Sequence, residues 1–230
     1  MVCVWQSSEK VTATVDASDR APELALALVL TVTAAAISGW RVLQVVWQRY
    51  LGGPAIFTYP TTVSLTFLVL GLILAIPARH RSGLTLGRQP DSWLATAAVV
   101  GLPVLCVALI YPILPERPFA GASRDMWLLS PVAQDLWFLG VLYGRLDAVF
   151  QGYVHQHVPI RQALPLTALF FALWHLPNLL STMSPGYVAF QLSYVFVGCT
   201  LVGLSRQWTG TIMYATLSHM AVNYIAWSTS

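Results

Sequence analysis

The sequence predicts an all-α protein, a polytopic bundle of about seven transmembrane helices, and three observations lead to this prediction. The 230 residues are 57% hydrophobic. Only 9% of them are charged, whereas a typical soluble domain carries about 25% charged residues. The apolar residues also form long runs, and a helix needs roughly 20 such residues to cross a bilayer. These features exclude an ordinary soluble domain and predict an integral membrane protein.

The apolar runs define the predicted spans, which form a single domain over residues 21–230 after a polar tail at residues 1–20. The spans lie near residues 23–47, 59–77, 93–114, 127–145, 162–180, 186–205 and 210–228. The first run is too long for the core of a signal peptide, and no cleavage site follows it, so we expect it to remain as the first helix. Between the second and third spans, 79–92 reads as a basic loop rich in turn residues, with Ser92 as the cap of the next helix.

Basic residues are distributed unevenly between the two sides of a seven-helix arrangement. One side carries Lys10, Arg20, Arg79, Arg81, Arg88, Arg145, Arg161 and Arg206, and the other carries Arg41, Arg49, Arg117 and Arg124. The positive-inside rule then places the N-terminus in the cytoplasm. Basic residues interleaved with aromatic ones do not occur as a cluster, so we expect the lipid bilayer, and not a nucleic acid, as a partner.

Ionisable residues inside spans are rare and usually functional. Asp135 is the only acidic residue deep in an apolar run, and His175 and His219 are the only histidines so placed. His219 and Asn223 are four residues apart and share one helix face. Gln134 precedes Asp135 directly, so their side chains point about 100° apart on a helix. Burying these groups separately in lipid would cost several kcal/mol, and we therefore expect them to converge on one polar site.

The order of these residues resembles the motifs of the CPBP family, the type II CAAX prenyl endopeptidases and their bacterial relatives. The family motif F-x-x-x-H corresponds to FALWH at 171–175, and H-x-x-x-N corresponds to HMAVN at 219–223. The family's E-E-x-x-x-R motif corresponds to QDLWFL at 134–139, where Gln134 and Asp135 replace the two glutamates and Leu139 replaces the arginine. The resemblance covers about residues 90–228.

This resemblance implies a bacterial plasma-membrane protein with a CAAX-protease-like core, and it implies roles for individual residues. In the family, the first glutamate and the F-x-x-x-H histidine are thought to activate water, and the H-x-x-x-N pair is thought to hold an oxyanion. His175 would then activate water, His219 and Asn223 would hold the oxyanion, and Gln134 would occupy the position of the general base. A glutamine cannot accept that proton, and loss of a positioned base costs about 10² to 10⁴ in rate. Ordinary peptide hydrolysis is therefore not expected.

Three functions follow as hypotheses. The first is a remodelled site that binds a hydrophobic polyene, isoprenoid or polyketide-like molecule and promotes a rearrangement or cyclisation. The second is an atypical endopeptidase for lipidated peptides that uses Asp135 and His175, with a helix distortion near Pro131. The third is a non-enzymatic immunity or scaffold protein. The predicted catalytic residues are Gln134, Asp135, His175, His219 and Asn223, and the predicted substrate contacts are Trp137, Phe138, Phe171, Trp174 and Asn178.

Cofactors are not expected, although a divalent metal at His175, His219 and Asp135 stays open as an alternative. The three cysteines, Cys3, Cys106 and Cys199, are far apart and match neither a CxxC pair nor a zinc site. Two of them lie inside apolar runs, and we expect these two to act as small core residues.

Overall fold

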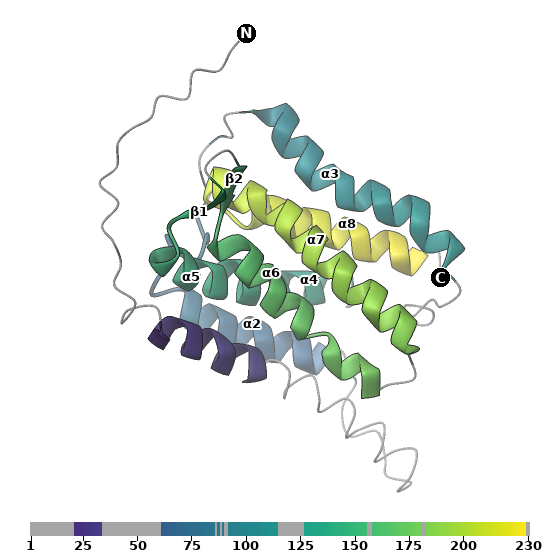
Figure 1. Ribbon diagram of the computed structural model, residues 1–230, viewed down its shortest axis with the longest axis horizontal. Coiled ribbons are helices and arrows are strands. Elements are labelled where there is room, and N and C mark those ends of the chain that lie inside the picture. Colours follow the sequence, from purple (N-terminus) through teal and green to yellow (C-terminus); the bar gives the residue numbers. More distant parts are fainter. Residues whose placement is uncertain are drawn as a thin grey trace, which may run out of the picture.

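A computed structural model describes residues 21–33, 61–85, 87, 89, 92–114, 127–155, 158–180 and 183–228. In these residues the chain is almost entirely helical (Figure 1). A helix at Ala21–Thr33 and α2 run along one side of the molecule, and α3 runs along the opposite side. The predicted N-terminal tail and the rest of the first predicted span lie outside the described residues.

The elements after the first helix follow the predicted apolar runs. They are α2 (Thr61–Ala75), α3 (Trp93–Ile110), η1 (Tyr111–Ile113), α4 (Leu129–Asp135), the π-helix η3 (Leu136–Leu142), α5 (Tyr143–Val149), β1 (Tyr153–His155), β2 (Val158–Arg161), α6 (Ala163–Leu173), η4 (Leu176–Leu180), α7 (Pro185–Thr209) and α8 (Met213–Ser228). The prediction of an all-α chain is wrong at one place, because β1 and β2 form an antiparallel hairpin. Its valine and tyrosine residues favour extended structure.

The number of spans is only partly supported. Of the described helices, two are long and apolar enough to cross a membrane, namely Trp93–Ile113 and Pro185–Thr209. Shorter apolar helices occur at Ala21–Thr33, Ser64–Ala75 and Ala163–Leu179. The described residues therefore form a mostly helical fold with two candidate membrane spans, and seven spans are not confirmed.

Local sequence signals set the ends of the long helices. The Ser92 hydroxyl accepts a hydrogen bond from the backbone N–H of Ala95 at 3.2 Å, which confirms the predicted cap of α3. The Ser184 hydroxyl caps α7 in the same way, at 3.1 Å from the Tyr187 nitrogen, and Pro185 occupies the first turn. Helix α7 ends at Gly210, whose φ of 79° suits a residue without a side chain.

The segments α4, η3 and α5 form one continuous helical stretch at the centre of the molecule. Every side chain of η3 is buried, and those of Phe138, Leu139 and Leu142 are 0% exposed. Helix α2 packs against α4 and η3, α8 packs against α4, and α6 packs against η3 and α5. A helix that is apolar on all sides belongs in a core, so the predicted span 127–145 is surrounded mostly by protein. Its distortion begins directly after Asp135, as a π-helix, one turn later than the predicted position at Pro131.

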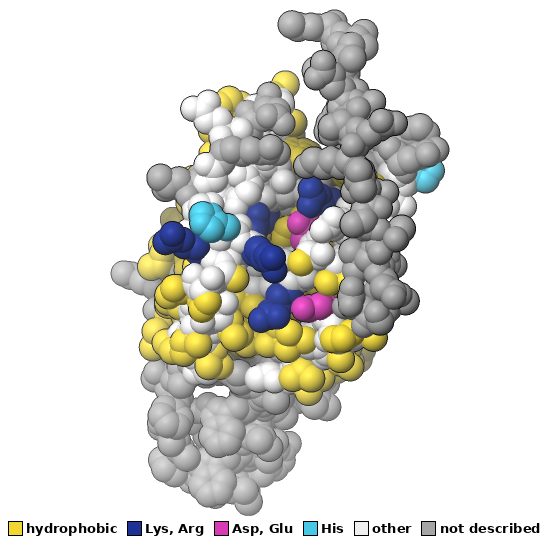
Figure 2. Space-filling model, turned by 90° about the vertical axis from the view of Figure 1, so that its left-hand side faces the viewer, with side chains coloured by type: hydrophobic (Ala, Val, Ile, Leu, Met, Phe, Trp, Pro, Cys, Tyr) yellow, Lys and Arg dark blue, Asp and Glu magenta, His cyan; other side chains and the backbone are white. Residues whose placement is uncertain are grey.

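Charged residues gather at one end of the bundle, where α2, α5 and α7 end (Figure 2). The guanidinium of Arg161 on β2 pairs with both carboxylate oxygens of Asp147 on α5, at 2.7 and 3.0 Å. The phenol of Tyr143 donates to the same carboxylate at 3.4 Å. Partial burial opposes the charge of Arg161, but its hydrogen bonds with Asp147 outweigh this effect and raise the pKa of the guanidinium above its usual value. The pair therefore anchors the hairpin to α5.

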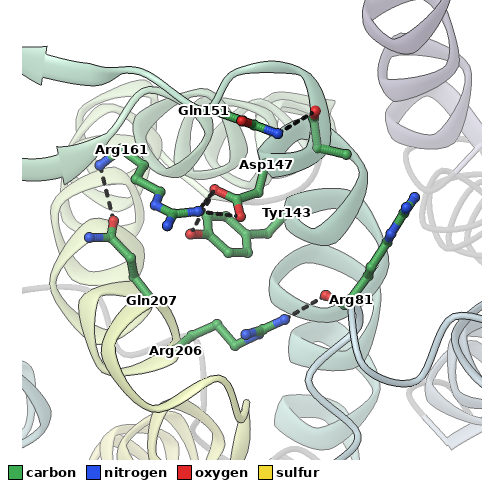
Figure 3. A network of polar contacts seen from close by, with 8 residues as sticks. Arg81, Tyr143, Asp147, Gln151, Arg161, Arg206 and Gln207 are labelled. Atoms are coloured by element: carbon green, nitrogen blue, oxygen red, sulfur yellow. Dashed lines mark hydrogen bonds and ion pairs between the residues drawn. The ribbon is translucent and has the colours of Figure 1, made fainter. Parts of the chain in front are cut away.

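A second contact at this end joins α7 to the turn that follows α2 (Figure 3). Arg206 is buried, stacks over the ring of Tyr143 at 5.5 Å and donates to the backbone carbonyl of Arg81 at 2.5 Å. The turn can approach α5 this closely because Gly144 has no side chain. A methyl group at Gly144 would overlap the same Arg81 carbonyl.

We expect Gly144→Ala to lower the free energy of unfolding by about 1–3 kcal/mol, the usual cost of overpacking. The measurement is unfolding in mixed detergent micelles. Gly198→Ala is the matched control, since a methyl group on α7 at that position meets nothing within 4 Å and alanine is the better helix former. Equal stability of the two variants would contradict the close approach at Gly144.

Candidate functional site

A carboxylate–imidazole pair lies between α4 and α8. The Nδ1 atom of His219 is 3.0 Å from Oδ1 of Asp135. The Asp135 side chain is 2% exposed and that of His219 is 18% exposed, so the carboxylate is fully enclosed and the imidazole is partly accessible. The second carboxylate oxygen, Oδ2, is buried and has no hydrogen-bond partner among the described residues. Sequence reasoning placed both residues in one site, and the packing of α8 on α4 makes them partners.

Gln134 points elsewhere, as the helical geometry predicted. Its Nε2 donates to the hydroxyl of Ser130 one turn earlier, at 2.6 Å, and its side chain is half-buried. This contact uses one of the two N–H donors of the amide, so the second N–H and the amide oxygen remain for another molecule. Ser130 was not predicted as a site residue. Its position four residues before Gln134, on the same helix face, was the signal that could have identified it.

His175 lies at the end of α6, next to both the aromatic core and His219. Its Nδ1 lies 2.9 Å from the backbone oxygen of Phe171, four residues earlier. The ring of Phe171 is 5.3 Å from the ring of His175 and 6.0 Å from that of His219. When Nδ1 of His175 donates to the Phe171 carbonyl, Nε2 is left as its hydrogen-bond acceptor.

The hypothesis that Asp135 works with His175 stays a prediction, and the structure gives Asp135 a partner on another helix. The hydrogen-bond partner of Asp135 is His219, because the face of α4 that carries Asp135 packs against α8. The π-helix follows Asp135 instead of preceding it, so it does not turn this side chain away from α8. Within the described part of the chain, no three His, Cys, Asp or Glu side chains gather closely enough to hold a metal ion.

The predicted aromatic contacts form a packed layer beside the imidazoles. Phe138 stacks on Phe171 with ring centres 4.5 Å apart, and Phe171 stacks on Trp174 at 5.8 Å. Trp137 and Phe138 are 2% and 0% exposed and belong to the hydrophobic core. Phe171 and Trp174 are buried in the same core, and Phe171 also contacts the two histidines.

The two asparagines differ in position. The Asn178 amide donates to Oε1 of Gln191 at 2.9 Å and so ties η4 to α7. Asn223 is half-buried, one turn after His219 on α8. The structure therefore gives Asn178 a role in joining helices. The oxyanion role of Asn223 stays a prediction.

The geometry allows proton transfer by an imidazole that a carboxylate orients. If Nδ1 of His219 carries the proton, it donates to Asp135, and Nε2 can accept a proton from another molecule. The carboxylate then stabilises the imidazolium, as in other acid–base pairs of this type. Gln134 cannot take part in such a transfer.

A double-mutant cycle tests the Asp135–His219 pair. We expect Asp135→Ala and His219→Ala to show a coupling energy of about 1–3 kcal/mol in unfolding, since the hydrogen bond involves a charged group. The matched control is the cycle of Asp135→Ala with His175→Ala, for which we expect less than about 0.5 kcal/mol. A larger coupling with His175 would show that Asp135 has the other partner.

Comparison with known proteins identifies the family of the chain. The family described as type II CAAX prenyl endopeptidase Rce1-like matches residues 102–225, more than half of the chain. The match includes the aligned motifs at 134–139, 171–175 and 219–223. No curated protein and no solved structure gives a significant match. The chain belongs to the CPBP family of type II CAAX prenyl endopeptidase-like membrane proteins.

Proposed function

We propose that this membrane protein binds a hydrophobic polyene, isoprenoid or polyketide-like molecule and rearranges or cyclises it by acid–base chemistry. The observation that carries the proposal is the buried contact between Asp135 and His219 at 3.0 Å, in a site whose family base position is Gln134. The site thus retains a group able to move a proton although it lacks the family's glutamate. The position in the membrane favours a substrate that reaches the site from lipid.

The replacement of the first glutamate argues against the family's usual hydrolysis. Gln134 cannot deprotonate water at any relevant pH, and one of its two N–H donors is engaged with Ser130. Leu139, which replaces the family's arginine, is fully buried among apolar groups. A carboxylate at position 134 would have no arginine to pair with. An unpaired charge in a buried site lowers the stability by several kcal/mol. Both changes remove charge together, which fits a remodelled site better than a decayed one.

The proton-transfer steps can be assigned to side chains of this chain. His219 Nε2 accepts a proton from an activated carbon or hydroxyl of the substrate, while Nδ1 donates to Asp135. The new imidazolium then returns the proton to a second atom of the same molecule, so an isomerisation or cyclisation is balanced without water. The second N–H of the Gln134 amide can donate to a carbonyl, and Nε2 of His175 can accept from a hydroxyl, so both can orient the substrate.

The aromatic layer supports an apolar substrate. Phe171 contacts both imidazole rings and is itself backed by Phe138 and Trp174. Flat rings of this kind suit the faces of conjugated or branched unsaturated chains. A ligand held against Phe171 would lie within reach of both histidines.

A second candidate is an atypical intramembrane endopeptidase for lipidated peptides. Membership of the type II CAAX prenyl endopeptidase-like family favours it. In this case Asp135 and His219, with His175, would have to activate a water molecule in place of the missing glutamate. The candidate predicts cleavage of a farnesylated peptide by the wild-type chain and a higher rate after Gln134→Glu.

The proposal is tested with two defined probes on the full chain in neutral lipid nanodiscs. Binding is measured with cis-parinaric acid, a fluorescent polyene, by energy transfer from tryptophan. Proton transfer is measured in D₂O as deuterium uptake by a long-chain unsaturated ketone. We expect His219→Ala to lower deuterium uptake by about 10²-fold or more, because it removes the base. Binding of the polyene should change little in this variant.

Leu217→Ala serves as the control, because Leu217 is an exposed residue on the same helix. If His219→Ala leaves deuterium uptake by the ketone unchanged, the acid–base role of His219 is refuted. Cleavage of a farnesylated peptide by wild type, lost in His219→Ala, would favour the endopeptidase. Normal function in cells of both His175→Ala and His219→Ala would favour the third alternative, an immunity or scaffold protein.

A further inference from the structure

The charged end of the bundle carries more positive than negative charge. Every arginine among the described residues lies at this end, on the turn after α2, on α5, on β2 or in the last turn of α7. They are Arg79, Arg81, Arg145, Arg161 and Arg206. The described carboxylates that face them are Glu23 and Asp147 only. Figure 2 shows these arginines gathered around the acidic groups, above a band of apolar side chains.

The ion pairs at this end do not use all of the positive charge. Arg161 forms an ion pair with Asp147 through two short contacts. Arg145 and Glu23 are 3.9 Å apart, a distance too long for a hydrogen bond, and both side chains are partly exposed. Neither Arg81 nor Arg206 forms an ion pair with a carboxylate of the described residues, and Nε of Arg206 is buried without a hydrogen-bond partner there. An anion would therefore find unsatisfied positive charge.

A small cleft lies beside Arg81 and Arg145. It is bounded by the start of the helix Ala21–Thr33, the end of α2 and the η3–α5 stretch, and its lining includes Glu23, Leu74, Arg81, Ser82, Val141 and Arg145. The side chain of Arg81 points away from Arg206, whose contact is with the Arg81 carbonyl (Figure 3). The guanidinium of Arg81 is therefore available to a ligand at the cleft.

The surroundings of the cleft distinguish a lipid from a free ion. Leu74 lines the cleft itself and is 36% exposed. Other exposed apolar residues lie nearby. They are Ile73 near the end of α2, Ile76 just after it, and Leu24 and Leu28 on the helix Ala21–Thr33. On both of these apolar helices, exposed side chains therefore continue away from the arginines. A molecule with a phosphate at one end and a hydrocarbon chain at the other matches the arginines and the apolar side chains beside them.

We propose that the cleft between Arg81 and Arg145 binds the phosphate of an anionic phospholipid, with an acyl chain lying along Leu74 and its exposed apolar neighbours. Arginine suits a phosphate because its planar guanidinium presents several N–H donors to the oxygens. Glu23 Oε2 is buried without a hydrogen-bond partner among the described residues. A hydroxyl of the lipid headgroup can donate to it, which favours a glycerol headgroup over choline. This binding site is separate from Asp135 and His219 and does not depend on the proposed chemistry.

The test compares three probes on the purified full chain in neutral detergent. These are dioctanoyl phosphatidylglycerol, dioctanoyl phosphatidylcholine and inorganic phosphate, and the readout is the lipid retained in native mass spectrometry together with the shift of Tm. We expect phosphatidylglycerol to be retained and to raise Tm, and the other two probes to do neither. The double variant Arg81→Gln/Arg145→Gln should weaken phosphatidylglycerol binding by about tenfold or more, as expected for losing charge-assisted hydrogen bonds.

The control is Arg79→Gln, which removes one positive charge from the same exposed turn as Arg81 without lining the cleft, whereas the double variant removes two. Equal loss of binding in Arg79→Gln and in the double variant would overturn the site and indicate a diffuse charge effect. Equal retention of phosphatidylcholine, or an equal effect of inorganic phosphate, would overturn the choice of an anionic lipid. The Tm of each variant without lipid shows that it is folded, so a loss of binding can be assigned to the cleft.

Discussion

The carboxylate of Asp135 is the constraint on which the centre of this molecule depends. A charged group in an apolar interior is stable only with a partner, and here the imidazole of His219 lies 3.0 Å from it. The contact determines how α4 and α8 face each other. Helix geometry points Gln134 in another direction, where it is half-buried and bonded within its own helix. The same pair is the group with which the site can move a proton.

The buried helical stretch of α4, η3 and α5 connects this site to the charged end of the bundle. Asp135 comes directly before the π-helix, and Tyr143 and Asp147 come after it. Small residues along this stretch let other segments approach closely, as Gly144 does for the turn at Arg81. One continuous element therefore carries Asp135, the partner of His219, toward its start and Asp147, the partner of Arg161, toward its end.

The replacements in the first family motif are best understood together. Gln134 and Leu139 remove a negative and a positive charge from neighbouring turns of one helix. Leu139 packs fully into the core, and Gln134 forms a hydrogen bond with Ser130. Each new residue is thus accommodated by its surroundings, while Asp135, His175 and His219 remain near one another. This combination supports altered chemistry at an inherited position, and the proposed acid–base role follows from it.

The sequence alone determined the helical membrane class, the helix start at Ser92 and the family, because hydropathy, capping residues and motif order are local properties of the chain. It also identified Asp135, His175 and His219, since ionisable groups are conspicuous in apolar runs. The tertiary structure decided which of them are partners. Asp135 contacts His219 and not His175, Asn178 joins two helices, and Phe138 is enclosed in the core. These outcomes depend on which helix faces meet in space, and periodicity shows only which residues share a face.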